Sequence, residues 1–86
     1  MESINFQNRY FQHFKGGYYR LLHIASHSET LEPYVVYQAL YGEKSIWIRP
    51  EKMFFEDIIL DNQKVPRFRE LNQSELESFL KRDETI

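Results

Sequence analysis

The chain contains no cysteine, and only three glycines and three prolines among its 86 residues. The absence of cysteine excludes a disulfide and a thiolate metal site, so a domain of this size must be stabilised by packing. No stretch approaches the roughly 20 apolar residues of a membrane-spanning helix, and Met1–Gln12 has no apolar run of signal-peptide length. We therefore expect a cytoplasmic protein that does not enter a membrane.

The chain also lacks an excess of basic residues, since its formal net charge is -2. Up to Arg69 there are nine basic against eight acidic residues, a net charge of +1, and from Glu70 onward two against five, a net charge of -3. Dedicated duplex-binding proteins usually show a strong basic excess, so this balance disfavours that class. Aromatic residues are plentiful instead, with seven Phe, six Tyr and one Trp, and they must supply much of the core volume.

The residue pattern predicts a series of short strands. Tyr18–His27 and Tyr34–Tyr41 are rich in β-branched, aromatic and long apolar residues, and polar Ser28–Pro33 lies between them. Further along, the pattern predicts a strand over Ile46–Arg49 that ends at Pro50, a helical turn within Arg49–Phe55, a strand over Glu56–Leu60, a turn at Asp61 and Asn62, and a short edge strand over Lys64–Arg69, interrupted by Pro66.

The pattern changes to a helical one after Leu71. Asn72 can cap a helix whose third residue, Glu75, reaches back to it, and Leu71 and Leu76 occupy the positions of a hydrophobic staple. Leu76, Phe79 and Leu80 then form a narrow apolar stripe. We expect this stripe to cover the rest of the domain or a partner subunit.

Together these elements predict one mainly β domain, a small antiparallel SH3-like barrel or roll of about five strands with a short helical turn and a C-terminal α-helix. The boundaries that we expect are an N-terminal extension over residues 1–12, the barrel over residues 13–70 and the helix over residues 71–86.

The chain resembles a family of short bacterial proteins known as domain of unknown function 1653. The resemblance rests on "HFKGG" followed by Tyr19, "HSET" at His27–Thr30, "VVYQALYG" at Val35–Gly42, Trp47 with "RP" at Arg49–Pro50, "MF" at Met53–Phe54 and "VPRF" at Val65–Phe68. Asn62 stands where the family is expected to have a turn glycine, and the helix after Leu71 lies outside these motifs. The resemblance implies a fold and candidate surface positions, and it implies no reaction.

The three histidines raise the question of a metal site or a catalytic site. His23 and His27 are four residues apart, which on an extended strand separates them by roughly 13 Å, too far to share one ion. "HSE" at His27–Glu29 contains the residue types of a hydrolytic site, but sequence adjacency does not bring such side chains together. We expect Ser28–Thr30 to build a loop. We expect His27 to lie on the buried face of the strand with Tyr19 and Leu21. We therefore expect the protein to bind no metal and no cofactor.

Gly16 and Gly17 follow Lys15 but show no phosphate-loop spacing, and a strand rather than a helix comes next. They are expected to provide a tight turn or a close backbone approach.

Trp47 and Arg49 favour a recognition surface, because residues two apart on a strand project from one face. On this interpretation Ile46 and Ile48 occupy the opposite, core face; the alternative is that Trp47 fills the barrel and Arg49 pairs with an acid such as Glu56 or Asp57. The residues that we assign to an aromatic and basic ligand-binding face are Tyr37, Tyr41, Trp47, Arg49 and Arg67, with His13, Lys15, His27 and Glu29 at its rim.

The sequence therefore predicts a non-catalytic binding module for a peptide, small ligand or nucleic acid. One alternative is a small enzyme that uses His27 and Glu29 in acid–base chemistry. A third alternative is that the apolar face of the C-terminal helix pairs two subunits into a homodimer.

Overall fold

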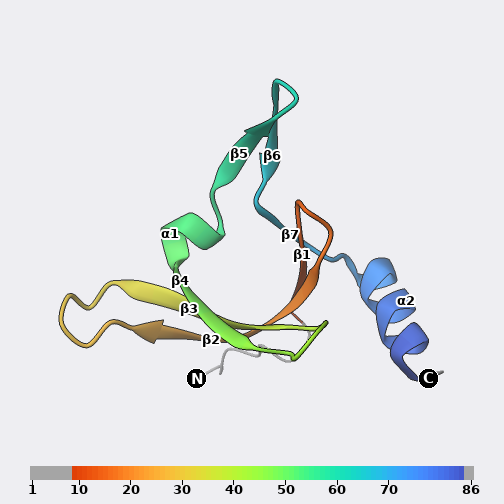
Figure 1. The fold of residues 1–86 in the computed structure, drawn as a ribbon, viewed down its shortest axis with the longest axis horizontal. Helices are drawn as coiled ribbons and strands as arrows, with labels where there is room; N and C mark the ends of the chain where they lie inside the picture. Colours follow the sequence, from red (N-terminus) through yellow and green to blue (C-terminus); the bar gives the residue numbers. More distant parts are fainter. Residues whose placement is uncertain (1–8, 85–86) are drawn as a thin grey trace.

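The computed structural model describes residues 9–84. Within these residues, seven strands and two helices follow one another (Figure 1). They are β1 (Tyr10–His13), β2 (Tyr18–Ser26), β3 (Pro33–Ala39), β4 (Ile46–Pro50), α1 (Glu51–Phe54), β5 (Asp57–Leu60), β6 (Gln63–Pro66), β7 (Phe68–Glu70) and α2 (Gln73–Glu84).

The strands form a five-stranded antiparallel sheet in the order β4-β3-β2-β1-β7 and a separate two-stranded hairpin, β5-β6. Figure 1 shows this hairpin projecting away from the sheet. The mainly β class, the helical turn and the C-terminal helix are confirmed. The sheet does not close, because β4 and β7 lie at opposite edges, so the molecule is an open roll rather than a barrel.

The sheet begins at Tyr10, three residues before the boundary expected at His13. β1 pairs with β2 on one side and with β7 on the other, and Phe11 is 2% exposed. Residues 10–12 therefore belong to the sheet and not to the expected N-terminal extension, whose residues 1–8 lie outside the described part of the chain. A four-residue strand gives too short an alternation to be found from sequence.

A bulge in β2 changes which side chains face the core. Leu21 lies opposite Tyr37, but the register then shifts, so that His23 lies opposite Val36 and Ile24 opposite Val35. The extra residue reverses the alternation of faces. The expectation that His27 shares a buried face with Leu21 is therefore wrong, and His27 is exposed.

The faces of β4 are also the reverse of those expected. Trp47 and Arg49 lie opposite Tyr37 and Val35, two of the three buried residues of β3, so they are on the core side of the sheet. Ile46 and Ile48 lie on the other face and are 59% and 64% exposed. Their predicted role in the core is wrong, because α1 covers the opposite face of this edge strand.

The core lies on one side of the sheet, which we call the inner face. It consists of Phe11, Leu21, Val35, Tyr37, Phe54 and Phe68. α1 contributes Phe54, which is fully buried and stacks on Phe68 with 4.1 Å between ring centroids. This contact joins α1 to β7 across the inner face.

α2 packs against the outer face of β1 and β2. Phe79 contacts Tyr10 and Tyr18, with ring centroids 5.8 Å and 5.1 Å away, and Leu71 and Leu76 are buried. The predicted capping box is present, since Glu75 N donates to Asn72 Oδ1 and Asn72 N donates to Glu75 Oε1. Within residues 9–84, no helix has the length and apolar character needed to cross a membrane.

Candidate functional site

The turn between β1 and β2 positions the first part of the site. Gly16 has a φ of 110°, which glycine tolerates without strain, and its N–H donates to His13 O. Lys15 N donates to Nδ1 of His13 at 3.1 Å, so the imidazole is fixed against its own turn. A Cβ at Gly17 would lie 2.8 Å from Cε1 of Tyr41. The two glycines therefore provide the tight turn and the close approach that the sequence indicates.

Tyr19 is the centre of an aromatic cluster on the inner face. Its hydroxyl is hydrogen-bonded to the hydroxyl of Tyr41, and its ring lies 5.5 Å from those of Tyr37, Tyr41 and Phe68. Burial, with the hydrogen bond to Tyr41 as the second cause, raises the pKa of Tyr19 to about 12. This phenol is therefore neutral at physiological pH and can donate a hydrogen bond.

A pocket of about 350 Å³ opens beside this cluster. We call it the tyrosine pocket, and it is lined by His13, Lys15, Gly17, Tyr19 and Tyr41.

Positively charged residues lie in and near the tyrosine pocket, where Lys15 is part of the lining. Arg49 donates from Nε to the Tyr37 hydroxyl at 3.4 Å and lies over the Phe68 ring, while Arg67 is paired with Glu56 at 2.6 Å. Burial first, and then Arg49, Arg67 and Lys15, lower the pKa of His13. Within residues 9–84, no carboxylate lies within 4 Å of the charged groups of Arg49 or Lys15.

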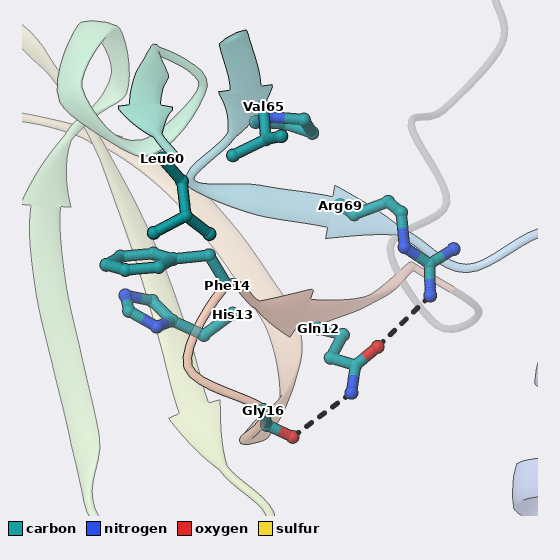
Figure 2. Close-up of a pocket in the computed structure, with 8 residues that line it drawn as sticks. Gln12, His13, Phe14, Gly16, Leu60, Val65 and Arg69 are labelled. Atoms are coloured by element: carbon teal, nitrogen blue, oxygen red, sulfur yellow. Dashed lines mark hydrogen bonds between the residues drawn. The ribbon is translucent and has the colours of Figure 1, made fainter. Parts of the chain in front are cut away.

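A second pocket, the hairpin cleft, shares His13 with the tyrosine pocket, and Figure 2 shows the residues that line it. Its volume is about 340 Å³, and Phe14, Leu60, Val65 and Pro66 form its apolar wall. The remaining lining residues are Gln12, His13, Gly16 and Arg69. Figure 2 shows the Gln12 amide between Gly16 and Arg69, donating to the Gly16 carbonyl oxygen at 3.2 Å and accepting from Arg69 at 3.1 Å. The polar groups at this end of the cleft are therefore hydrogen-bonded to one another.

The His27–Thr30 segment builds a loop, as its hydroxyls indicate. Nδ1 of His27 accepts hydrogen bonds from the backbone N–H groups of Glu29 and Thr30, and Thr30 Oγ1 accepts one from Glu32 N. His27 and Glu29 are exposed, and β2 separates them from Tyr19 by roughly 25 Å. The structure therefore does not bring them to the rim of the predicted face.

The structure gathers most of the other residues assigned to that face. Tyr37, Tyr41, Arg49, His13 and Lys15 surround Tyr19, and Arg67 lies close enough to act on His13. Trp47 lies opposite Tyr37 on the edge strand and is 54% exposed.

Tyr19 and Phe68 are the site residues that the sequence interpretation missed. The strand pattern predicts that Tyr19 lies on a buried face with Leu21, and Tyr19 is half-buried there. The signal that identifies its role is the hydroxyl contact with Tyr41, which joins residues 22 apart in sequence and so is invisible to a local pattern. Among residues 9–84, no three His, Asp or Glu side chains gather as a group that could hold a metal ion.

These features define a small open antiparallel β-roll with a tyrosine-lined, positively charged pocket on its inner face. The chain belongs to the family described as protein of unknown function (DUF1653), whose model matches residues 9–70. That segment includes all seven strands and ends before α2.

A crystal structure of a DUF1653 protein from Bordetella bronchiseptica is similar to this chain. The TM-score is 0.67 and the sequence identity 29%, over 77% of this chain and 86% of that chain. No curated protein matches the sequence.

Proposed function

We propose that this protein is a non-catalytic binding module that holds a small aromatic or flat apolar ligand with one anionic group in the tyrosine pocket. The observation that carries this proposal is the positive charge of Arg49 and Lys15 beside the pocket, which no carboxylate within residues 9–84 neutralises. Arg49 is half-buried and Lys15 is exposed. A half-buried cation without a counter-ion favours an anionic partner.

The size and lining of the pocket support a small ligand. Its volume of about 350 Å³ lies within the range of small-molecule sites, and two phenol rings offer flat apolar surface. The neutral Tyr19 hydroxyl and the cation of Lys15 supply hydrogen-bond donors near the expected anionic group.

Nucleic acid is less well matched by these charges. A single-strand groove needs positive charge that follows the phosphate backbone. Here Glu56 neutralises Arg67, Glu75 neutralises Arg69, and the whole chain has a net charge of -2. One anionic group fits the remaining cations better than a polyanion does.

The loop that holds His27 and Glu29 gives little support to the alternative of a small enzyme. The hydrogen bond between His27 and Glu29 joins the imidazole to the Glu29 backbone N–H and not to its carboxylate. Both residues are exposed, so no water-excluding cleft surrounds them.

The proposal is tested with benzoate, an aromatic carboxylate, and benzamide, its neutral counterpart, titrated into the labelled protein by NMR. Benzoate is expected to shift the amide resonances of Gly17 and Tyr41, and benzamide is expected to bind more weakly because it lacks the charge. Arg49→Gln should weaken benzoate binding about tenfold, which corresponds to about 1.4 kcal/mol.

Lys52→Gln is the matched control, because it removes the same charge from an exposed lysine of α1 that does not line the tyrosine pocket. The proposal fails if benzamide binds as tightly as benzoate, if neither ligand binds, or if Lys52→Gln is as harmful as Arg49→Gln. Tighter binding of octathymidylate, with affinity falling steeply as salt is added, would assign the face to single-stranded nucleic acid instead.

A further inference from the structure

β4 presents an unpaired, apolar edge at one side of the sheet. Among residues 9–84 it pairs only with β3, so its other edge has no strand partner in that part of the chain for its backbone N–H and C=O groups. Ile46, Trp47 and Ile48 are 59%, 54% and 64% exposed, which makes three consecutive large apolar residues open to solvent. Exposed apolar residues on both faces of an edge strand favour pairing with another strand.

The devices that usually protect sheet edges are confined to the end of β4, where Arg49 and Pro50 occupy its last two positions. No charged residue lies between Ser45 and Ile48, and the pairing with β3 is continuous without a bulge. The opposite edge is different, because β7 has only three residues and two of them, Arg69 and Glu70, are charged and ion-paired.

We propose that β4 pairs antiparallel with β4 of a second copy of this chain, around a two-fold axis at Trp47. In this register Trp47 lies opposite Trp47 of the other copy, Ile46 lies opposite Ile48, and Ser45 lies opposite Arg49. The two five-stranded sheets then form one continuous sheet, and both tyrosine pockets open on the same side of it.

The sequence of β4 favours a second copy of this chain over a different partner. An isologous antiparallel pair places each residue opposite its mirror position, and Ile46-Trp47-Ile48 reads the same in both directions. The four isoleucines meet on the outer face and the two indoles on the inner face, which are favourable cross-strand pairs. The charges are compatible, because Arg49 faces a serine and not another cation.

This pairing does not depend on the tyrosine pocket, which Trp47 does not line. The contact is small, because only one short strand from each copy takes part. Small interfaces are typically weak, so the dimer should form at micromolar or higher concentration and dissociate on dilution.

Sedimentation equilibrium of the full chain, followed over a dilution series, tests the association. The mass is expected to rise from monomer to dimer as the concentration increases. Trp47 is the only tryptophan, so its emission should shift to shorter wavelength over the same range as the indole becomes covered. A protein that stays monomeric throughout the series would overturn the proposal.

Two pairs of variants test the surface and the register. Ile48→Lys should abolish the dimer, whereas Ile59→Lys, which changes a 70% exposed isoleucine on the β5-β6 hairpin, should leave it intact. Circular dichroism of each variant reports whether the monomer remains folded.

The chain has no cysteine, so Trp47→Cys introduces a single thiol that faces its own copy only in the proposed register. Directly opposed residues have the Cα separation that a disulfide requires, so mild oxidation should give a covalent dimer. Ile59→Cys should give far less. Association without this cross-link, through α2 or any other surface, would contradict the proposed pairing.

Discussion

His13 lines both the tyrosine pocket and the hairpin cleft, so its protonation reports on the charge around them. Burial is the main cause that lowers its pKa, and Arg49 is the next. Arg49→Gln should therefore raise the pKa of His13 without restoring the ordinary value of about 6.5. NMR titration of the His13 Hε1 resonance measures this change. A pKa that falls, or does not move, in Arg49→Gln would show that Arg49 does not act on His13.

The same shift makes folding stability depend on pH. A histidine whose folded pKa lies below its unfolded value stabilises the protein above the unfolded pKa, and this contribution is lost as the pH falls toward the folded pKa. Between about pH 8 and about pH 5, the wild-type protein should therefore lose more unfolding free energy than His13→Gln. Urea denaturation at each pH provides the comparison.

At the scale of single residues, the sequence predicts which residues belong to the site better than it predicts which face of a strand each residue occupies. Tyr37, Tyr41 and Arg49 were assigned to one surface, and they do lie together around Tyr19. The exposure of His27 was not predictable, because it depends on a register shift between Leu21 and His23 that the sequence does not indicate. An inserted residue reverses every later assignment on the strand.

At the scale of secondary-structure elements, local side-chain contacts determine where a helix begins, and α2 shows this most clearly. The Asn72 side chain accepts a hydrogen bond from Glu75 N at 2.8 Å, satisfying one of the free N–H groups at the start of the helix. Asn72→Ala should lower the unfolding free energy by about 1 kcal/mol, as loss of an N-cap typically does. Ser74→Ala, two residues further on and exposed, is the control.

Urea denaturation measures this loss only if α2 unfolds together with the sheet. The contacts of Phe79 with Tyr10 and Tyr18 indicate that it does. An unchanged midpoint together with reduced helical circular dichroism would instead mean that α2 unfolds independently of the sheet.

Elements with their own start and stop residues were predictable, and those without were not. Asp61 and Asn62 have φ values of 52° and 63°, and their residue types indicated the turn between β5 and β6. β1 was missed because its four residues are ordered by their partners, β2 and β7, and not by a local pattern. Ile46 and Ile48 form an alternating set just as Trp47 and Arg49 do, so only the position of α1 decides which face is covered.

At the scale of the whole molecule, contacts between side chains replace the hydrogen bonds that would close a barrel. The sequence predicts the antiparallel β domain, but whether β4 and β7 pair depends on contacts between residues far apart in the chain. In the structure these edges remain separate, and Phe54 and Arg67 bridge the inner face through Phe68 and Glu56. The open roll is therefore held by α1 and its aromatic contacts.

Phe54 is the residue on which this arrangement most depends. It is fully buried, stacks on Phe68 with the rings 4° from parallel, and also contacts Phe11 and Tyr37. Phe54→Ala should lower the unfolding free energy by about 3–5 kcal/mol, because the cavity cannot be filled without moving α1.

Phe55→Ala provides the matched control, since the neighbouring ring is 42% exposed and its loss should cost much less. Urea denaturation followed by circular dichroism measures both variants. Because Phe68 also packs on Tyr19 and His13, Phe54→Ala should disturb the resonances of the tyrosine pocket as well as stability. Equal losses in the two variants would mean that α1 contributes only general apolar cover, and that the pocket does not depend on the Phe54–Phe68 stack.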